Sequence, residues 1–355
     1  MKRIYDIAAY VWPSYSGNDP RTLTFWPEGM GEWQTVRDAK PKFDGHVEPR
    51  KPLWGFVNEA NPDIMEMQIN AALRHGVNVF IYDWYWYDNR PFLEDCLNDG
   101  FLSAPNNMQM CFYLMWANHD VNNLWDKRNS DRLNDTLIWE AAVDRTRFEI
   151  ICHRIIELYF IKPNYYKING KPVFMIYDLE NLIKGLGGHD QVYDAFAWFN
   201  HQCKEAGLEG VHIQLCIRKD IDAKFFRSLG FESSTNYQYV HMTDIDRPYD
   251  VILEDIKKIW ENHALSGLPY FPHVSVGWDN NTRFHGFKPG IIKENTPERI
   301  EDAFRAAKAF LDERPELPPL ITVNSWNEWT EGSYLQPDEL YGYGYLEAIR
   351  KVFLS

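Results

Sequence analysis

The stretch MEMQINAALRHGVNVFIYDW, residues 65–84, carries the pattern that decides the fold. Its first half repeats apolar side chains at the spacing i, i+4, i+7 and i+8, which is typical of an amphipathic helix: Met65, Ile69, Ala72 and Leu73. Gly76 follows where the end of a helix needs a left-handed residue. Residues 77–83 are then a short aliphatic and aromatic run of the strand type. The stretch therefore predicts a helix followed directly by a strand.

The same alternation extends over the whole chain. Eight runs of the strand type occur, at residues 4–10, 77–83, 110–116, 172–178, 212–218, 233–239, 273–279 and 320–326. Further helical spacing lies between or after these runs, at residues 148–158, 192–203, 252–259, 300–311 and 346–353. Strict alternation predicts a parallel sheet, and eight units predict its closure into a (β/α)8 barrel.

Turn and loop signals complete this prediction. Asn61-Pro62 and Thr296-Pro297 each place a capping side chain before a proline at the first helical position. The connections at residues 12–61 and 116–144 are too long for ordinary turns and are expected to be loops at the barrel mouth. No repeat or linker divides the chain, so residues 1–355 are expected to form one domain, closed by the last helix.

Composition narrows the classes of function. The 355 residues have a formal net charge of -14, which disfavours nucleic acid and membrane surfaces as partners, and 15% of them are aromatic, including 14 Trp. The five cysteines are odd in number and widely spaced, and no HExxH or GxSxG motif is present. We therefore expect neither a metal nor an organic cofactor. The absence of a signal or membrane-spanning segment predicts a cytoplasmic protein, or a periplasmic or secreted one if a leader has been removed.

The ends of the predicted strands are rich in aromatic, amide and carboxylate side chains. In an α/β barrel these ends surround the active site, and this mixture suits a sugar, which offers apolar faces and hydroxyl groups. Any one of these aromatic residues could instead belong to the core. The predicted substrate-binding residues are Tyr10, Trp12, Tyr82, Asp83, Trp84, Trp116, Asn118, Tyr177, Tyr237, Trp278, Asp279, Trp326 and Asn327.

The sharpest local feature is NEWTEG, residues 327–332, directly after the last strand. Glu328 and Glu331 would face opposite ways on a continuous strand, but a turn after Glu328 would bring this i, i+3 pair onto one face. Glu-x-x-Glu is also common on solvated helices, whereas the flanking Trp326 and Trp329 favour a site. Two close carboxyl groups repel, so one is expected to keep a proton and act as acid while the other stays ionised. We predict Glu328 and Glu331 to be the catalytic residues.

At these residues the sequence resembles the WbsX-like proteins, a family classed with glycoside hydrolase family 99. The strings that carry the resemblance span nearly the whole chain: AAYVWPSYSGNDP (8–20), VFIYDWYWYDNRPFLE (79–94), MWANH (115–119), NGKPVFMIYD (169–178) and SWNEWTEGSYLQPDELYGYGYLEA (325–348). The resemblance implies a (β/α)8 fold, retaining hydrolysis of α-mannosidic linkages in a glycan or polysaccharide, and no cofactor. It also implies that Glu331 is the acid/base and that Glu328 activates the sugar 2-hydroxyl.

Two departures from the family pattern leave the substrate open. Gln336 stands where a glutamate is expected, and His119-Asp120 stands where Glu-Asn is usual. Both positions are expected near the mouth. His119 and His241 could bind substrate, but a structural role is expected for both. The alternative functions are a glycosyltransferase of polysaccharide biosynthesis and an inactive carbohydrate-binding barrel.

Overall fold

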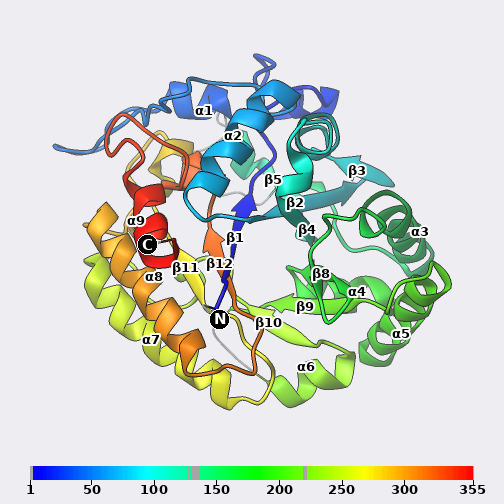
Figure 1. Ribbon diagram of the computed structural model, residues 1–355. Coiled ribbons are helices and arrows are strands. Elements are labelled where there is room, and N and C mark those ends of the chain that lie inside the picture. The colour runs from blue at the N-terminus through cyan, green and yellow to red at the C-terminus, as the bar shows by residue number, and fades with distance from the viewer. Residues whose placement is uncertain (1–2, 127, 129–135, 219–221, 355) are drawn as a thin grey trace.

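The computed structural model describes residues 3–126, 128, 136–218 and 222–354. Eight parallel strands form a nearly closed barrel, and helices surround it on the outside (Figure 1). The barrel strands are β1 (Asp6–Val11), β2 (Val79–Tyr87), β4 (Cys111–Trp116), β8 (Lys171–Ile176), β9 (His212–Cys216), β10 (Ser233–Thr235), β11 (His273–Ser275) and β12 (Leu320–Asn324). Each of the eight predicted strands is confirmed, although several end earlier than expected.

Parallel pairing runs in the order β10-β9-β8-β4-β2-β1-β12-β11. The barrel strands that come first and last in the sequence, β1 and β12, are therefore neighbours. Their register pairs Ile7 with Ile321 and Ala9 with Val323. The gap between β10 and β11 is narrowed by the segment before β11, because Phe271 N donates to the carbonyl of Ser234 at 3.0 Å. The Thr235 and Thr322 hydroxyls lie 2.7 Å apart, which adds a polar contact between β10 and β12.

In the described part of the chain, the spacing of apolar residues predicts six of the helices that cover the strands, but not the two at residues 179–186 and 223–229. The helices are α2 (Pro62–Arg74), α3 (Arg145–Ile155), α4 (Leu179–Leu186), α5 (His189–Glu205), α6 (Ala223–Leu229), α7 (Tyr249–Leu265), α8 (Pro297–Asp312) and α9 (Gly344–Phe353). In α2 the buried face includes Met65, Ile69 and Ala72, and the Asn61 side chain accepts the N–H of Asp63, so the predicted cap is confirmed. Gly76 has φ +94°, as the prediction of a left-handed residue requires. Thr296 precedes α8 but makes no side-chain cap hydrogen bond.

The two long connections contain local structure of their own. The first includes the 3-10 helix η1 (Pro20–Thr24) and the short helix α1 (Trp33–Arg37), and α1 lies at the top of the view in Figure 1. The second pairs β5 (Val121–Asn122) with β6 (Leu137–Trp139) in an antiparallel hairpin. Part of that predicted loop, residues 127 and 129–135, lies outside the described residues. None of the helices in the described part of the chain has the length and apolar character needed to cross a membrane.

Candidate active site

A cavity of about 280 Å³ opens at the carboxyl ends of the barrel strands. Its lining combines acidic residues, two arginines and aromatic rings from β2, from the segments that follow the other strands, and from both long loops. The lining residues are Trp12, Asp83, Tyr85, Met115, Ala117, His119, Leu124, Trp125, Tyr177, Arg218, Tyr237, Arg283, Glu328 and Glu331. Both predicted catalytic glutamates and four of the predicted substrate-binding residues, Trp12, Asp83, Tyr177 and Tyr237, therefore line one cavity.

The predicted turn after Glu328 is present. Asn327–Glu328 (β13) pairs antiparallel with Ser333–Tyr334 (β14), and the 3-10 helix η9 (Trp329–Glu331) connects them. Gly332 has φ +60°, and a Cβ atom at this position would lie 3.1 Å from the Cβ of Asp279. Glycine therefore meets both the backbone and the packing requirement of the turn. The turn brings the Glu328 and Glu331 side chains to the same cavity.

Arg283 is the buried cation that holds the acidic groups together. It belongs to the 3-10 helix η8 (Asn280–Arg283), which follows β11. Its Nη1 lies 2.7 Å from Glu331 Oε1, its Nη2 lies 3.6 Å from Glu328 Oε2, and its Nε donates to Glu32 Oε1 at 3.1 Å. One guanidinium thus faces three carboxyl groups, and the cluster needs protons to approach neutrality.

The two glutamates share this excess of negative charge. Burial, followed by repulsion from Glu331, raises the pKa of Glu328 well above its ordinary value, and Arg283 opposes this shift. Burial also raises the pKa of Glu331, against the direct ion pair with Arg283. Because Arg283 is closer to Glu331, the free protein should keep a proton on Glu328 and the negative charge on Glu331.

The Tyr237 hydroxyl connects Glu328 to a fourth carboxyl group, that of Asp83. It lies 2.9 Å from Asp83 Oδ2 and 3.1 Å from Glu328 Oε1. A hydroxyl has one proton to donate, so one of the two carboxyl groups must itself be protonated for both contacts to be hydrogen bonds. Burial raises the pKa of Asp83 well above its ordinary value, which favours a shared proton here. Asp83 Oδ1, Glu328 Oε2 and Glu331 Oε2 accept no hydrogen bond from the described residues.

Several predicted residues on the strands point away from the cavity. Successive side chains of a strand face opposite sides, so β2 turns Asp83 and Tyr85 inward and Tyr82 and Trp84 outward. Tyr82 packs against Phe101, and Trp84 Nε1 donates to Glu94 Oε1 at 2.7 Å. The prediction that both contact substrate is corrected for this reason.

Trp116 and Trp326 are corrected in the same way. The Trp116 ring stacks on Phe174, with centroids 6.4 Å apart, and faces Phe148 of α3. Trp326 Nε1 donates to Gln68 of α2 at 2.8 Å, and its side chain is fully buried. Both indoles join the barrel to the surrounding helices and do not line the cavity.

Four further predicted residues support the site from outside the cavity. The Asn118 side chain bonds both the backbone N–H and the carbonyl of Asp178, which joins the segments after β4 and β8. Asn327 Oδ1 accepts the N–H of Trp12 at 2.8 Å, and Asn327 Nδ2 donates to the Trp12 carbonyl at 2.9 Å. These two bonds fix Trp12 in the cavity wall. Tyr10 lies beneath Tyr237, with ring centroids 4.8 Å apart. Trp278 does not line the cavity either, and its carbonyl accepts the N–H of Ile292.

Asp279 belongs to a buried cluster with His46 and Glu48, whose ligand-type atoms lie within 4.8 Å of one another. Lys42 N–H donates to His46 Nδ1 at 3.1 Å, so the neutral imidazole carries its proton on Nε2, which lies 2.8 Å from Asp279 Oδ2. Arg50 Nε lies 3.9 Å from Glu48 Oε1. The hydrogen bond from Lys42 uses the one lone pair of the neutral His46 imidazole, which a metal would need. Asp279 N also donates to the Glu331 carbonyl at 2.6 Å, so the cluster anchors the turn that carries Glu328 and Glu331.

Sequence reasoning missed several cavity residues. Tyr85 stands two positions after Asp83 on one strand, so alternation could have identified it. Arg283 and Trp125 lie in connections without periodicity, where the sequence carried no signal. Arg218 ends the predicted strand at residues 212–218, so its place at a strand end could have identified it. His119 lines the cavity although a structural role was expected, and burial lowers its pKa, so its imidazole should be neutral at pH 7.

The departure at Gln336 lies behind the cavity wall, which corrects its expected place near the mouth. Its amide donates to Glu59 Oε1 at 2.7 Å and to Gln68 Oε1 at 3.1 Å, and its Oε1 accepts from Trp329 Nε1 at 2.7 Å. The Gln336 side chain is almost completely buried. Gln336 therefore supports the turn at residues 329–332 from the side that faces α2.

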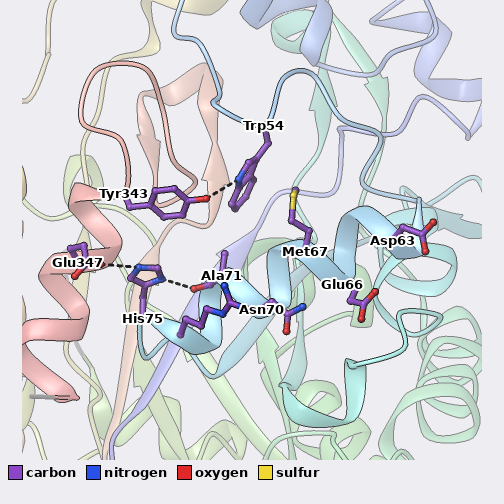
Figure 2. Close-up of a pocket in the computed structure, with 10 residues that line it drawn as sticks. Trp54, Asp63, Glu66, Met67, Asn70, Ala71, His75, Tyr343 and Glu347 are labelled. Carbon is purple, nitrogen blue, oxygen red and sulfur yellow. Dashed lines mark hydrogen bonds and ion pairs between the residues drawn. The ribbon is translucent and has the colours of Figure 1, made fainter.

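A larger cavity, of about 670 Å³, lies on the outer wall between α2 and α9 (Figure 2). Trp54 Nε1 donates to the Tyr343 hydroxyl at 3.1 Å, and His75 lies between Glu347 and the Ala71 carbonyl (Figure 2). The acidic cluster around Arg283 lines the smaller cavity instead, and the carboxyl ends of the strands are where α/β barrels place their chemistry. We therefore take the smaller cavity as the candidate active site.

Solved structures share this fold. A GH99 endo-alpha-mannosidase from Bacteroides thetaiotaomicron superimposes with a TM-score of 0.64 and 13% identity, covering 98% of this chain and 97% of that one. A glycoside hydrolase-like protein gives a TM-score of 0.65 at 14% identity, over 99% and 94% of the two chains. At these identities the likeness concerns the fold.

A family model identifies the family, and two sequence relatives were found. Two proteins named WxcX, from two strains of Xanthomonas campestris pv. campestris, are each 28% identical over 346 residues. The alignment covers 94% of this chain, which spans about half (47%) of the length of these curated relatives. The family model described as Glycosyltransferase WbsX matches residues 7–349. The chain therefore belongs to the WbsX family and has a barrel like that of the family 99 glycoside hydrolases.

Proposed function

We propose that this chain is a retaining glycoside hydrolase that cleaves α-mannoside-like linkages in a glycan or polysaccharide. The observation that carries the proposal is the Glu328–Arg283–Glu331 arrangement, in which both carboxyl groups face one aromatic-walled cavity. Trp12, Tyr85 and Trp125 supply rings for the apolar faces of a sugar. The carboxyl groups and the Tyr237 hydroxyl supply hydrogen-bonding groups for its hydroxyls.

The proposed reaction has two steps. In the first, Glu331 donates a proton to the leaving oxygen, while Glu328 accepts the proton of the sugar 2-hydroxyl, whose oxygen attacks the anomeric carbon. This forms a 1,2-anhydro sugar. In the second step Glu331 takes a proton from water, which attacks the anomeric carbon, and Glu328 returns its proton to the 2-oxygen. The two inversions leave the anomeric configuration unchanged.

The roles require a proton on Glu331 when substrate is bound, whereas the free cluster favours Glu328. A sugar 2-hydroxyl that donates to Glu328 stabilises the ionised form of this carboxylate and so favours moving the shared proton to Glu331. Asp83 assists in the same direction. A protonated Asp83 donates to the Tyr237 oxygen, which leaves the Tyr237 proton free to hydrogen bond to ionised Glu328.

The test is hydrolysis of a panel of defined α-mannosides, with NMR of the first-formed anomer. Glu331→Gln and Glu328→Gln should each lower kcat by several powers of ten, because both groups act on charge that develops in the transition state. Glu339→Gln is the matched control, since Glu339 lies in the same segment and its side chain is 61% exposed. Unchanged turnover in Glu331→Gln, or an inverted product, would refute the mechanism.

Transfer to a sugar acceptor is the second candidate, and the description of the family model as a glycosyltransferase favours it. The same carboxyl groups would serve, with an acceptor hydroxyl in place of water. Product analysis with and without nucleotide sugars separates the two activities. A product that forms only in the presence of a nucleotide sugar would replace hydrolysis by transfer.

A further inference from the structure

A second cavity, of about 340 Å³, adjoins the candidate active site. Tyr177 and Arg218 line both cavities, so the phenol ring and the guanidinium form the boundary between them. Ile183, Phe225 and Phe226 give the second cavity an apolar wall. A chain of sugar units that occupies both cavities would therefore pass Tyr177 and Arg218.

Arg218 differs from Arg283 in having no acidic partner among the described residues. Its guanidinium lies over the Tyr177 ring, 5.9 Å from the centroid, and its side chain is exposed. Asp178 and Glu180 line the same cavity, but no described carboxylate forms an ion pair with Arg218. Asp178 is already engaged, because its Oδ1 caps α4 by accepting the N–H of Asn181 at 2.9 Å.

The charge of Arg218 is unusual for its surroundings. The first cavity is acidic, with Asp83, Glu328 and Glu331 in its lining and Arg283 bound within the cluster. His119 also lines this cavity, but burial lowers the pKa of its imidazole, so this side chain should be neutral. In a chain of net charge -14, a guanidinium without an ion-pair partner among the described residues marks a place where a negative group on a substrate would be tolerated.

We propose that the second cavity is a subsite for a sugar unit that bears a carboxylate, which Arg218 binds. This inference rests on the proposed carbohydrate-active function and names its substrate class. A planar guanidinium matches a carboxylate with two parallel hydrogen bonds. One guanidinium balances one negative charge, whereas a phosphate group carries nearly two and would call for a second cation. The apolar wall would contact the C–H face of the uronic acid ring.

The test is calorimetric binding to the Glu331→Gln protein, which should not turn the ligand over. The probes are the disaccharide glucuronosyl-mannose and the same disaccharide with its carboxyl group reduced to an alcohol. The acidic probe should bind at least about ten-fold more tightly at low ionic strength, and added salt should reduce this preference. Arg218→Gln in the same background should abolish the preference, and Arg218→Lys should restore part of it.

Arg227→Gln is the matched control, because this substitution removes the same charge. Arg227 is an exposed arginine of α6 and lines neither cavity. The variant should keep the preference for the acidic probe. Equal binding of the two probes, no measurable binding of the acidic probe, or a preference that survives Arg218→Gln would overturn the proposal. Failure of the proposed hydrolytic function would be seen in a different experiment, in which the unmodified protein would not turn over neutral α-mannosides.

Discussion

At the scale of single residues, the site is governed by a shortage of positive charge. Arg283 faces Glu32, Glu328 and Glu331, and Asp83 adds a fourth carboxyl group through Tyr237. Buried carboxylates without full compensation bind protons, so this cluster provides the raised pKa values that acid catalysis at neutral pH requires. Tyr237 matters because its one hydroxyl lies between Glu328 and Asp83.

Tyr237→Phe should lower kcat by about a hundred- to a thousand-fold, the range seen when one preorganised donor is removed. The reason is the loss of the hydrogen bond that stabilises ionised Glu328. The phenyl ring can keep the contact with Tyr10, so the variant should fold. Steady-state kinetics on the best α-mannoside would measure the effect, with a thermal melt as control. A change confined to KM would contradict the role given to the hydroxyl.

At the scale of elements, the turn that carries Glu328 and Glu331 is held by hydrogen bonds from its neighbours. Ser325 Oγ accepts the N–H of Glu328 at 2.7 Å and donates to the Ser333 carbonyl at 2.7 Å. Behind the turn, Glu59 accepts amide hydrogen bonds from Gln336, Gln68 and Asn327, which connects α2 to the segment after β12. Burial raises the pKa of Glu59 to about 7, although these three donors favour its charged form.

This shift gives a prediction about stability and pH. The unfolded chain ionises Glu59 near pH 4.5, whereas the folded chain keeps the proton up to about pH 7. Unfolding therefore releases a proton in this window, and the contribution of Glu59 to stability falls as pH rises, by roughly 3 kcal/mol in total. The free energy of unfolding in urea should thus fall between pH 4.5 and 7.5 more in the unmodified protein than in Glu59→Gln. Parallel pH profiles of the two proteins would contradict the shift.

At the scale of the whole molecule, the C-terminal helix α9 belongs to the ring of helices around the barrel (Figure 1). Helix α9 packs against α8, and its buried face includes Leu346, Ile349 and Val352. The Asn295 carbonyl accepts the Tyr345 hydroxyl at 2.7 Å, which attaches α9 to the segment before α8. The last helix is therefore fixed to α8 and to the segment that precedes α8.

Leu346→Ala should lower the free energy of unfolding by about 2–5 kcal/mol, because Leu346 is fully buried and its truncation leaves a cavity. Urea unfolding monitored by circular dichroism would measure the change. Leu265→Ala is the matched control, since Leu265 at the end of α7 is 83% exposed and should cost less than about 0.5 kcal/mol. Equal effects of the two substitutions would show that α9 does not contribute to the core in this way.

The sequence by itself determined the order of strands and helices. Buried side chains recur every two residues in a strand and every 3.6 residues in a helix, and both spacings can be read within a short stretch of sequence. It also indicated the turn at NEWTEG and the pairing of Glu328 with Glu331. Only the tertiary structure decided which aromatic residues face the cavity: alternation along β2 turns Asp83 and Tyr85 inward but Trp84 outward. Arg283 and Glu32 reach the site through irregular loops, whose path depends on contacts between residues far apart in the chain. Local periodicity carries no information about such contacts, which is the physical reason that these two residues were found only in three dimensions.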